Sequence, residues 1–196
     1  MEKEKITKDW DYSHWSFRTG TRPFDGLEMM LENFIANINA ITRHPDGSVS
    51  ETKDTVARNS ISDTAIIMSY ALLEGFFSEE YEYYLKQERP NELLAMINAL
   101  LHKHDITLQD WKPRRKKIDM VRKLRNTVVH NNGVIKENIN VNACKEMFGE
   151  DNFKMKGGLS QLSPKGALLL VKEFRDIAQE YAEAVFMPNK DDNAGK

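Results

Sequence analysis

Apolar residues recur at steps of three and four over long stretches of this sequence, and this spacing constrains the fold more than any other feature. It gathers the apolar side chains on one face of an α-helix, and such a face needs a partner surface for its burial. The pattern predicts helices over residues 27–42, 55 or 60 to 86, 90–101, 116–130 and 164–187. The alternation of apolar and polar residues that is typical of strands is almost absent. We therefore expect an all-α fold, a helical bundle of four to five main helices that run up and down.

Capping and turn-forming residues indicate where several of these helices begin or end. The stretch His44–Ser48 combines Pro, Asp and Gly, so we expect a turn or loop after the first helix. Ser60 and Asp63 have the spacing of a capping box, which favours a start of the second helix at Ser60, although an earlier start stays open. Ser163 and Pro164 predict the start of the last helix, because the hydroxyl can cap it and Pro fits its first turn.

The length of 196 residues fits one domain, with a segment on either side of it. Residues 1–25 form an aromatic-rich N-terminal segment that we expect to lie across the domain or a partner. Residues 26–188 form the helical domain, and the polar residues 189–196 are expected to be a disordered tail. Within the domain, 136–161 has no strong period and predicts an excursion or a short hairpin, while Pro113 is expected to interrupt a short turn. The aromatic residues of the first segment are Trp10, Tyr12, Trp15, Phe17 and Phe24.

Charge and cysteine content exclude several classes of protein. The net charge of -2 does not indicate a generally basic nucleic-acid-binding protein, so any polyanion site must come from local clustering. Cys144 is the only cysteine, which excludes an internal disulfide and a zinc site built on several thiolates. No apolar run approaches the ~20 residues that span a bilayer, and no secretory signal is evident. We expect a cytoplasmic protein that needs no metal or other cofactor.

A basic run between Lys112 and Arg125 contrasts with the acidic balance elsewhere, since Asp119 is its single acid. Charge runs of this kind usually form a solvated helix face, but a patch that attracts phosphate is the alternative. The run consists of Lys112, Arg114, Arg115, Lys116, Lys117, Arg122, Lys123 and Arg125.

Polar residues that follow this run are spaced so that they share one helix face. Asn126 and His130 are four residues apart, and Arg122 is four residues before Asn126. Arg125 lies about 140° from His130 around an ideal helix, and its long side chain can still reach the same surface. The opposite face carries the apolar residues Ile118, Val121, Leu124 and Val128.

The string Arg125-Asn126-Thr127-Val128-Val129-His130, followed by Asn131-Asn132-Gly133, resembles the signature of HEPN domains. In that family four to six residues separate an Arg from a His, and a polar residue commonly follows the Arg. The stretch Ser69–Phe77 also resembles the core helix of the family, and the helical order is similar over roughly residues 27–187. The resemblance implies an HEPN-like helical bundle.

Many HEPN proteins are endoribonucleases that work without a metal, and the resemblance implies the same activity here. The 2′-hydroxyl of RNA would attack the adjacent phosphate and leave a 2′,3′-cyclic phosphate and a 5′-hydroxyl. His130 would be the general base or acid, since imidazole titrates near neutral pH. Arg125 would orient the phosphate and stabilise its developing charge, and Asn126 would hold His130 or the phosphate by a hydrogen bond.

The resemblance also implies partners. RNA would contact six further residues of the basic run, namely Arg114, Arg115, Lys116, Lys117, Arg122 and Lys123. A homodimer is expected, because in the family two motifs usually face each other across a dimer. Relatives are often toxins or defence effectors, so an antitoxin or a regulatory protein is a further expected partner.

Other interpretations of these residues stay open at this point. Arg125 and Asn126 can be ordinary surface residues, with His130 at the helix end, as in a non-catalytic HEPN-like module that binds RNA, a nucleotide or a protein. Glu74 could support the site by pairing with Arg125, or it could be a carboxylate at a helix edge. Gly75 beside it favours a close approach between helices.

Overall fold

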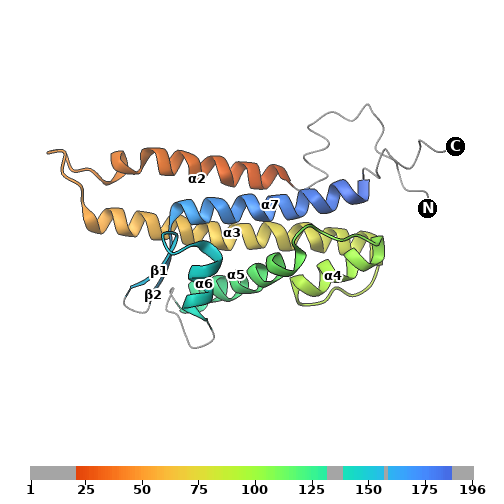
Figure 1. Cartoon of the computed structure of the whole chain (residues 1–196). Coiled ribbons are helices and arrows are strands. Elements are labelled where there is room, and N and C mark those ends of the chain that lie inside the picture. The colour runs from red at the N-terminus through yellow and green to blue at the C-terminus, as the bar shows by residue number, and fades with distance from the viewer. Residues whose placement is uncertain (1–20, 132–138, 157–158, 187–196) are drawn as a thin grey trace, which may run out of the picture.

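The computed structural model describes residues 21–131, 139–156 and 159–186, and Figure 1 shows their arrangement. The N-terminal aromatic residues Trp10, Tyr12, Trp15 and Phe17 and the expected tail 189–196 lie outside the described residues. The described part contains six α-helices and one antiparallel pair of short strands, which confirms the all-α class. The elements are α2 (Thr21–Thr42), α3 (Glu51–Leu85), α4 (Leu93–His104), α5 (Trp111–Asn131), α6 (Val141–Phe148), β1 (Phe153–Lys156), β2 (Leu159–Leu162) and α7 (Pro164–Phe186).

Three long helices, α2, α3 and α7, pack against one another and form the main body of the bundle (Figure 1). α3 and α7 run in the same direction, and α2 runs in the opposite one. Phe24, Leu73 and Phe174, one from each helix, are fully buried in a single apolar cluster. Burial of one such side chain contributes about 1.5–3 kcal/mol to the stability of the fold. This core therefore fixes the positions of α2, α3 and α7, against which the other elements pack.

The first helix begins at Thr21, earlier than the expected start at Leu27. Pro23 fits there because the first turn of a helix leaves its N–H groups without helical partners. Phe24 is buried, so the helical part of the chain extends on the N-terminal side of the expected boundary at residue 26. Arg175 of α7 also holds this end, with its Nη1 2.6 Å from a carboxylate oxygen of Glu28.

The expected turn over His44–Ser48 is confirmed. The N–H of His44 donates to the carbonyl of Ser48 at 2.7 Å, and Gly47 adopts a φ of 85°, which glycine reaches without steric cost. The carboxylate of Asp46 accepts hydrogen bonds from the Ser48 hydroxyl and N–H at 2.6 and 2.9 Å. These two bonds hold the pKa of Asp46 below its ordinary value.

The second helix, α3, begins at Glu51, before both expected starts at residues 55 and 60. Its cap is Ser50, whose hydroxyl oxygen accepts a hydrogen bond from the N–H of Lys53 at 3.4 Å. Ser60 is an interior residue of the helix, and its carbonyl accepts from the Thr64 hydroxyl at 2.8 Å. The first turns of α3 are polar and largely exposed, so apolar spacing gives no signal there.

The helix that carries the candidate motif, α5, also starts earlier than expected. It begins at Trp111, and Pro113 lies in its first turn instead of interrupting the chain. The indole N–H of Trp111 donates to the side-chain oxygen of Asn98 on α4 at 3.2 Å, which ties the start of α5 to α4.

The stretch 136–161 contains a short helix that the sequence pattern did not predict, and the hairpin that it did. Asn140 caps α6 by accepting a hydrogen bond from the N–H of Ala143 at 3.1 Å. β1 and β2 then pair with Phe153 opposite Leu162.

The two glycines Gly75 and Gly166 have opposite surroundings. A Cβ on Gly75 would meet no atom within 4 Å, so the expected packing role of Gly75 is wrong. A Cβ on Gly166 of α7 would lie 2.9 Å from Leu162 Cδ1 and 3.0 Å from Asn152 Cβ, so glycine is needed for the close approach of the hairpin to α7. The expected start of α7 is confirmed, because Ser163 Oγ accepts from the N–H of Gly166 at 3.0 Å.

In the part of the chain that the structure describes, no helix has the length and apolar character that crossing a membrane requires.

Candidate functional site

The candidate motif lies near the C-terminal end of α5, which packs against α3 and α4. Ile118, Val121 and Leu124 are at most 1 % exposed and form the expected buried face, while Val128 is half-buried. Thr127 is also buried, and its hydroxyl donates to the carbonyl of Lys123 at 2.9 Å, so it leaves no unsatisfied group. This buried face determines which side chains of α5 remain accessible.

Arg125 and Asn126 are half-buried and contact each other directly. Arg125 Nη1 donates to the side-chain oxygen of Asn126 at 3.0 Å, so the amide fixes the position of the guanidinium. The amide nitrogen of Asn126 remains as a donor for a further acceptor. His130 is exposed, one residue before the end of α5. The structure places Asn126 against Arg125 and gives no hydrogen bond between Asn126 and His130.

Tyr70 of α3 lies among the charged residues of this region, although the sequence pattern did not single it out. Tyr70 is only 4 % exposed, and this burial raises the pKa of its phenol to about 12. The charges of Glu74 and Asp119 raise this pKa as well, whereas those of Arg122 and Arg125 lower it. The Tyr70 phenol therefore lies within electrostatic range of the motif arginine and of Glu74.

Glu74 is half-buried on α3, and no ion pair joins it to Arg125 in the structure. The charge of Glu74 and the charge of Arg125 both act on the phenol of Tyr70. Glu74 and Arg125 therefore both lie near the contact between α3 and α5. Tyr70 and Glu74 are four residues apart on α3, and this spacing is the signal that could have added Tyr70 to the candidate residues.

Two cations of the basic run form ion pairs with α7. Arg114 Nη1 lies 2.5 Å from a carboxylate oxygen of Glu180, and Lys117 Nζ lies 2.5 Å from one of Glu173. The side chains of Arg114 and Lys117 are only 19 % and 22 % exposed. The backbone N–H of Gln109 also donates to Glu180. These two cations thus stabilise the packing of α5 and leave little surface for a polyanion.

Further along the helix, Asp119 pairs with two cations of its own helix. Its carboxylate oxygens lie 2.8 Å from Arg122 Nη2 and 2.8 Å from Lys123 Nζ. Arg122 keeps 41 % of its side chain exposed, so this pair is open to solvent. Arg115 and Lys116 are exposed and form no ion pair with another residue of the described ranges. The basic run is therefore divided into paired and open cations.

No group of three or more His, Cys, Asp and Glu residues in the described ranges is arranged to hold a metal ion. Cys144 is fully buried, and burial raises the pKa of its thiol to about 11, which suppresses the reactive thiolate.

Comparisons of this chain with protein-family models, with curated proteins and with solved structures find no match. The class that the structure defines is thus a helical bundle with a polar cluster, Tyr70, Glu74, Arg122, Arg125 and Asn126, at the contact of α3 with α5.

Proposed function

We propose that this chain is a metal-independent endoribonuclease of the HEPN type, which cleaves RNA through attack by its 2′-hydroxyl. The observation that carries the proposal is the end of α5, where an exposed imidazole follows a guanidinium that a neighbouring amide holds. Cleavage by an internal nucleophile needs proton transfer and charge stabilisation at phosphate, and these are the groups that supply them.

Each motif residue has a defined task in the proposed reaction. His130 accepts the proton of the 2′-hydroxyl or donates one to the leaving 5′-oxygen. Arg125 donates two N–H groups to the phosphate, and its bond to Asn126 reduces the freedom that it must lose on binding. The remaining amide N–H groups of Asn126 are available to the phosphate as well.

Tyr70 and Glu74 complete the surroundings of Arg125 in this proposal. The carboxylate of Glu74 and the phenol of Tyr70 lie within electrostatic range of one another, and Tyr70 is within that range of Arg125. The carboxylate of Glu74 acts on the same phenol as the guanidinium of Arg125, so it contributes to the electrostatic surroundings of Arg125. We assign both residues as positioning residues, since neither needs to touch RNA.

A homodimer in which the ends of the two α5 helices lie near the symmetry axis is part of the proposal. One chain offers a single histidine in the motif, and a second copy would supply the other proton-transfer group. Val129, next to His130, is 44 % exposed, which leaves an apolar side chain at the surface that would become an interface. An antitoxin or regulatory protein that covers this surface is proposed on the resemblance alone.

The decisive experiment incubates purified protein with mixed single-stranded RNA in EDTA and compares wild type with His130→Ala. We expect cleavage in EDTA with 2′,3′-cyclic phosphate ends, and a rate lower by about two to four orders of magnitude for the variant. His102→Ala is the matched control, because His102 is also exposed near the end of a helix. Activity that EDTA abolishes and magnesium restores would reject the mechanism.

Two further outcomes refine the test. RNA binding without any cleavage by wild type would favour the non-catalytic module. Light scattering that finds only monomers at micromolar concentration, with cleavage intact, would reject the dimer but would not contradict the proposed cleavage reaction.

A further inference from the structure

α3 and α7 lie side by side over a greater length than α2 covers. α2 starts at Thr21, whereas α3 and α7 run on past that point to Leu85 and Phe186 (Figure 1). An open groove of about 970 Å³ lies there. Arg22 and Pro23, from the first turn of α2, form one end of this groove, which we call the α3–α7 groove.

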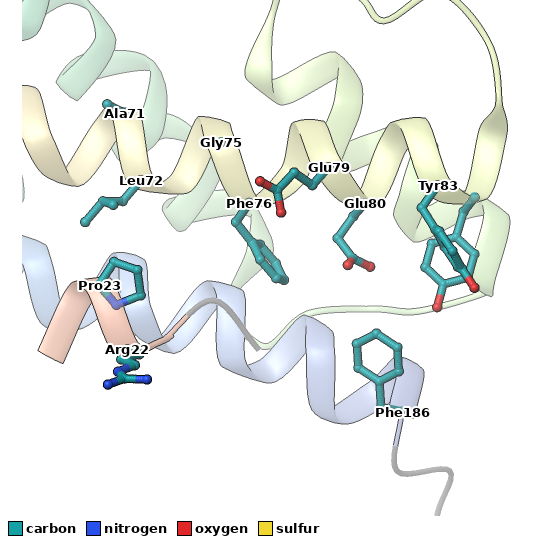
Figure 2. Close-up of a pocket in the computed structure, with 11 residues that line it drawn as sticks. Arg22, Pro23, Ala71, Leu72, Gly75, Phe76, Glu79, Glu80, Tyr83 and Phe186 are labelled. Atoms are coloured by element: carbon teal, nitrogen blue, oxygen red, sulfur yellow. The ribbon is translucent and has the colours of Figure 1, made fainter. Parts of the chain in front are cut away.

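The lining of the α3–α7 groove combines apolar and aromatic side chains with carboxylates. Leu72 and Phe76 project from α3 toward the groove, and Phe186 closes it from α7 (Figure 2). Glu79 and Glu80 add two carboxylates on the α3 side. Further lining residues are Ala71, Gly75, Tyr83 and Tyr84, and Tyr83 is 57 % exposed. An aromatic and acidic groove of this kind favours an occupant that is both aromatic and cationic.

We propose that the occupant of the α3–α7 groove is the chain's own segment 1–20. The segment joins α2 directly at the end of the groove that Arg22 and Pro23 form. Its last nine residues, from Tyr12 to Gly20, contain Trp15, Phe17 and Arg18 and no carboxylate. They thus carry the aromatic rings and the positive charge that complement this lining.

The reach of the segment matches the length of the groove. Phe17 and Trp15 precede Thr21 by four and six residues, so an extended backbone would place them about 13–20 Å from it. The groove follows α3 from Leu72 to Tyr83, and eleven helical steps span about 16 Å. The two aromatic residues can therefore lie along the groove without any rearrangement of α2.

The contact would extend the cover that α2 gives to α3 and α7, and it is independent of RNA cleavage. It would also give a buried position to the aromatic residues that precede the first helix of the bundle. A segment of a second copy could reach the groove by the same chemistry, and the experiment separates the two.

The first test measures tryptic cleavage after Arg18 in the full-length chain. Gly75→Leu adds a side chain to the lining of the groove, and its Cβ would meet no atom within 4 Å. Gly26→Leu is the matched control, since Gly26 is also helical and has an equally open Cβ position. We expect Gly75→Leu to speed cleavage after Arg18 about tenfold over wild type and control, as cleavage follows the population of the released segment. Equal rates in all three proteins would overturn the proposal.

The second test traps the contact by a disulfide between Ser16→Cys and Gly75→Cys. Cys144 is fully buried and will not compete for the introduced thiols. We expect an intramolecular disulfide that forms faster than the one between Ser16→Cys and Gly26→Cys. A covalent dimer would assign the groove to a second copy and overturn the proposal, and so would faster pairing with Gly26→Cys.

Discussion

The two halves of α5 carry the same kind of side chain and use it differently. In the first half, Arg114 and Lys117 are mostly buried in ion pairs with glutamates of α7. In the second half, Arg122 pairs with Asp119 of its own helix, and Arg125 contacts Asn126. A continuous run of positive charge is thus no continuous binding surface, because the tertiary partners of each residue decide its role.

The largest expected effect concerns Arg125→Ala in the second half. Loss of a phosphate contact should lower RNA cleavage by about two to four orders of magnitude and weaken RNA binding more than His130→Ala does. The free energy of unfolding should change by about 1 kcal/mol or less, since Arg125 lies outside the buried face. Cleavage assays together with denaturant unfolding measure both effects. Wild-type cleavage by folded Arg125→Ala and His130→Ala proteins would show that the nuclease interpretation is wrong, and loss of folding would show that the motif is structural.

The next largest effect concerns Arg114→Met in the first half. The change leaves Glu180 half-buried without its ion-pair partner, so the free energy of unfolding should fall by about 1–2 kcal/mol. The cleavage rate of the folded protein should stay at the wild-type level. Arg115→Met, at the adjacent exposed position, should change stability by less than about 0.5 kcal/mol. A loss of cleavage without a loss of stability would contradict the division of α5 into two halves.

A smaller effect is expected when the open cations Arg115 and Lys116 are both replaced by Ala. RNA affinity at low salt should fall about three- to tenfold, and the slope of affinity against salt should decrease by about 0.7 for each lost phosphate contact. Lys117→Met should leave that slope unchanged, because Lys117 is paired with Glu173. Titrations at several salt concentrations give the slopes, and equal changes for both variants would remove the distinction between paired and open cations.

The smallest effect concerns the ion pairs of Asp119. Burial raises the pKa of Asp119, but hydrogen bonds from Lys123 and Arg122 outweigh it and hold the pKa below the ordinary 3.8. A lowered pKa means that the stabilisation is present above pH 3.8 and is lost as the pH falls further. Because the side chain is 36 % exposed, we expect only a few tenths of a kcal/mol. Unfolding experiments between pH 6 and pH 3 should show this loss for wild type but not for Asp119→Asn.

Helices with periodic apolar residues are predicted from the sequence, but helix ends that consist of polar residues are predicted at the wrong positions. The start of α7 is correct because Ser163 and Pro164 form a local signal. The start of α3 is not, since Ser50 caps a first turn that buries almost nothing. The eight residues of α6 are too few for a clear period, although Cys144 and Phe148 both lie in the core.

For the candidate site, the spacing of residues along the sequence predicts which side chains share a helix. It does not predict contacts between residues that are far apart in the sequence. The spacing of Arg122, Asn126 and His130 places them on one helix correctly, because helical geometry is a local property. The pair of Arg114 with Glu180 joins residues 66 positions apart, and no local pattern predicts which cations such pairs will occupy. Tyr70 needs both kinds of information, since its spacing from Glu74 is local but its closeness to Arg125 is not.

The packing of α7 against both α2 and α3 has a consequence for synthesis of the chain. Val171, Phe174 and Ala178 of the last helix are fully buried, and this helix packs against α2 and α3, which end as early as Thr42 and Leu85. A nascent chain therefore exposes those parts of α2 and α3 that α7 covers until nearly all of the protein has left the ribosome. Ribosome stalling before residue 164 would leave a core that lacks the side chains of α7, so a partner that protects the uncovered faces during translation would act before any partner of the finished protein.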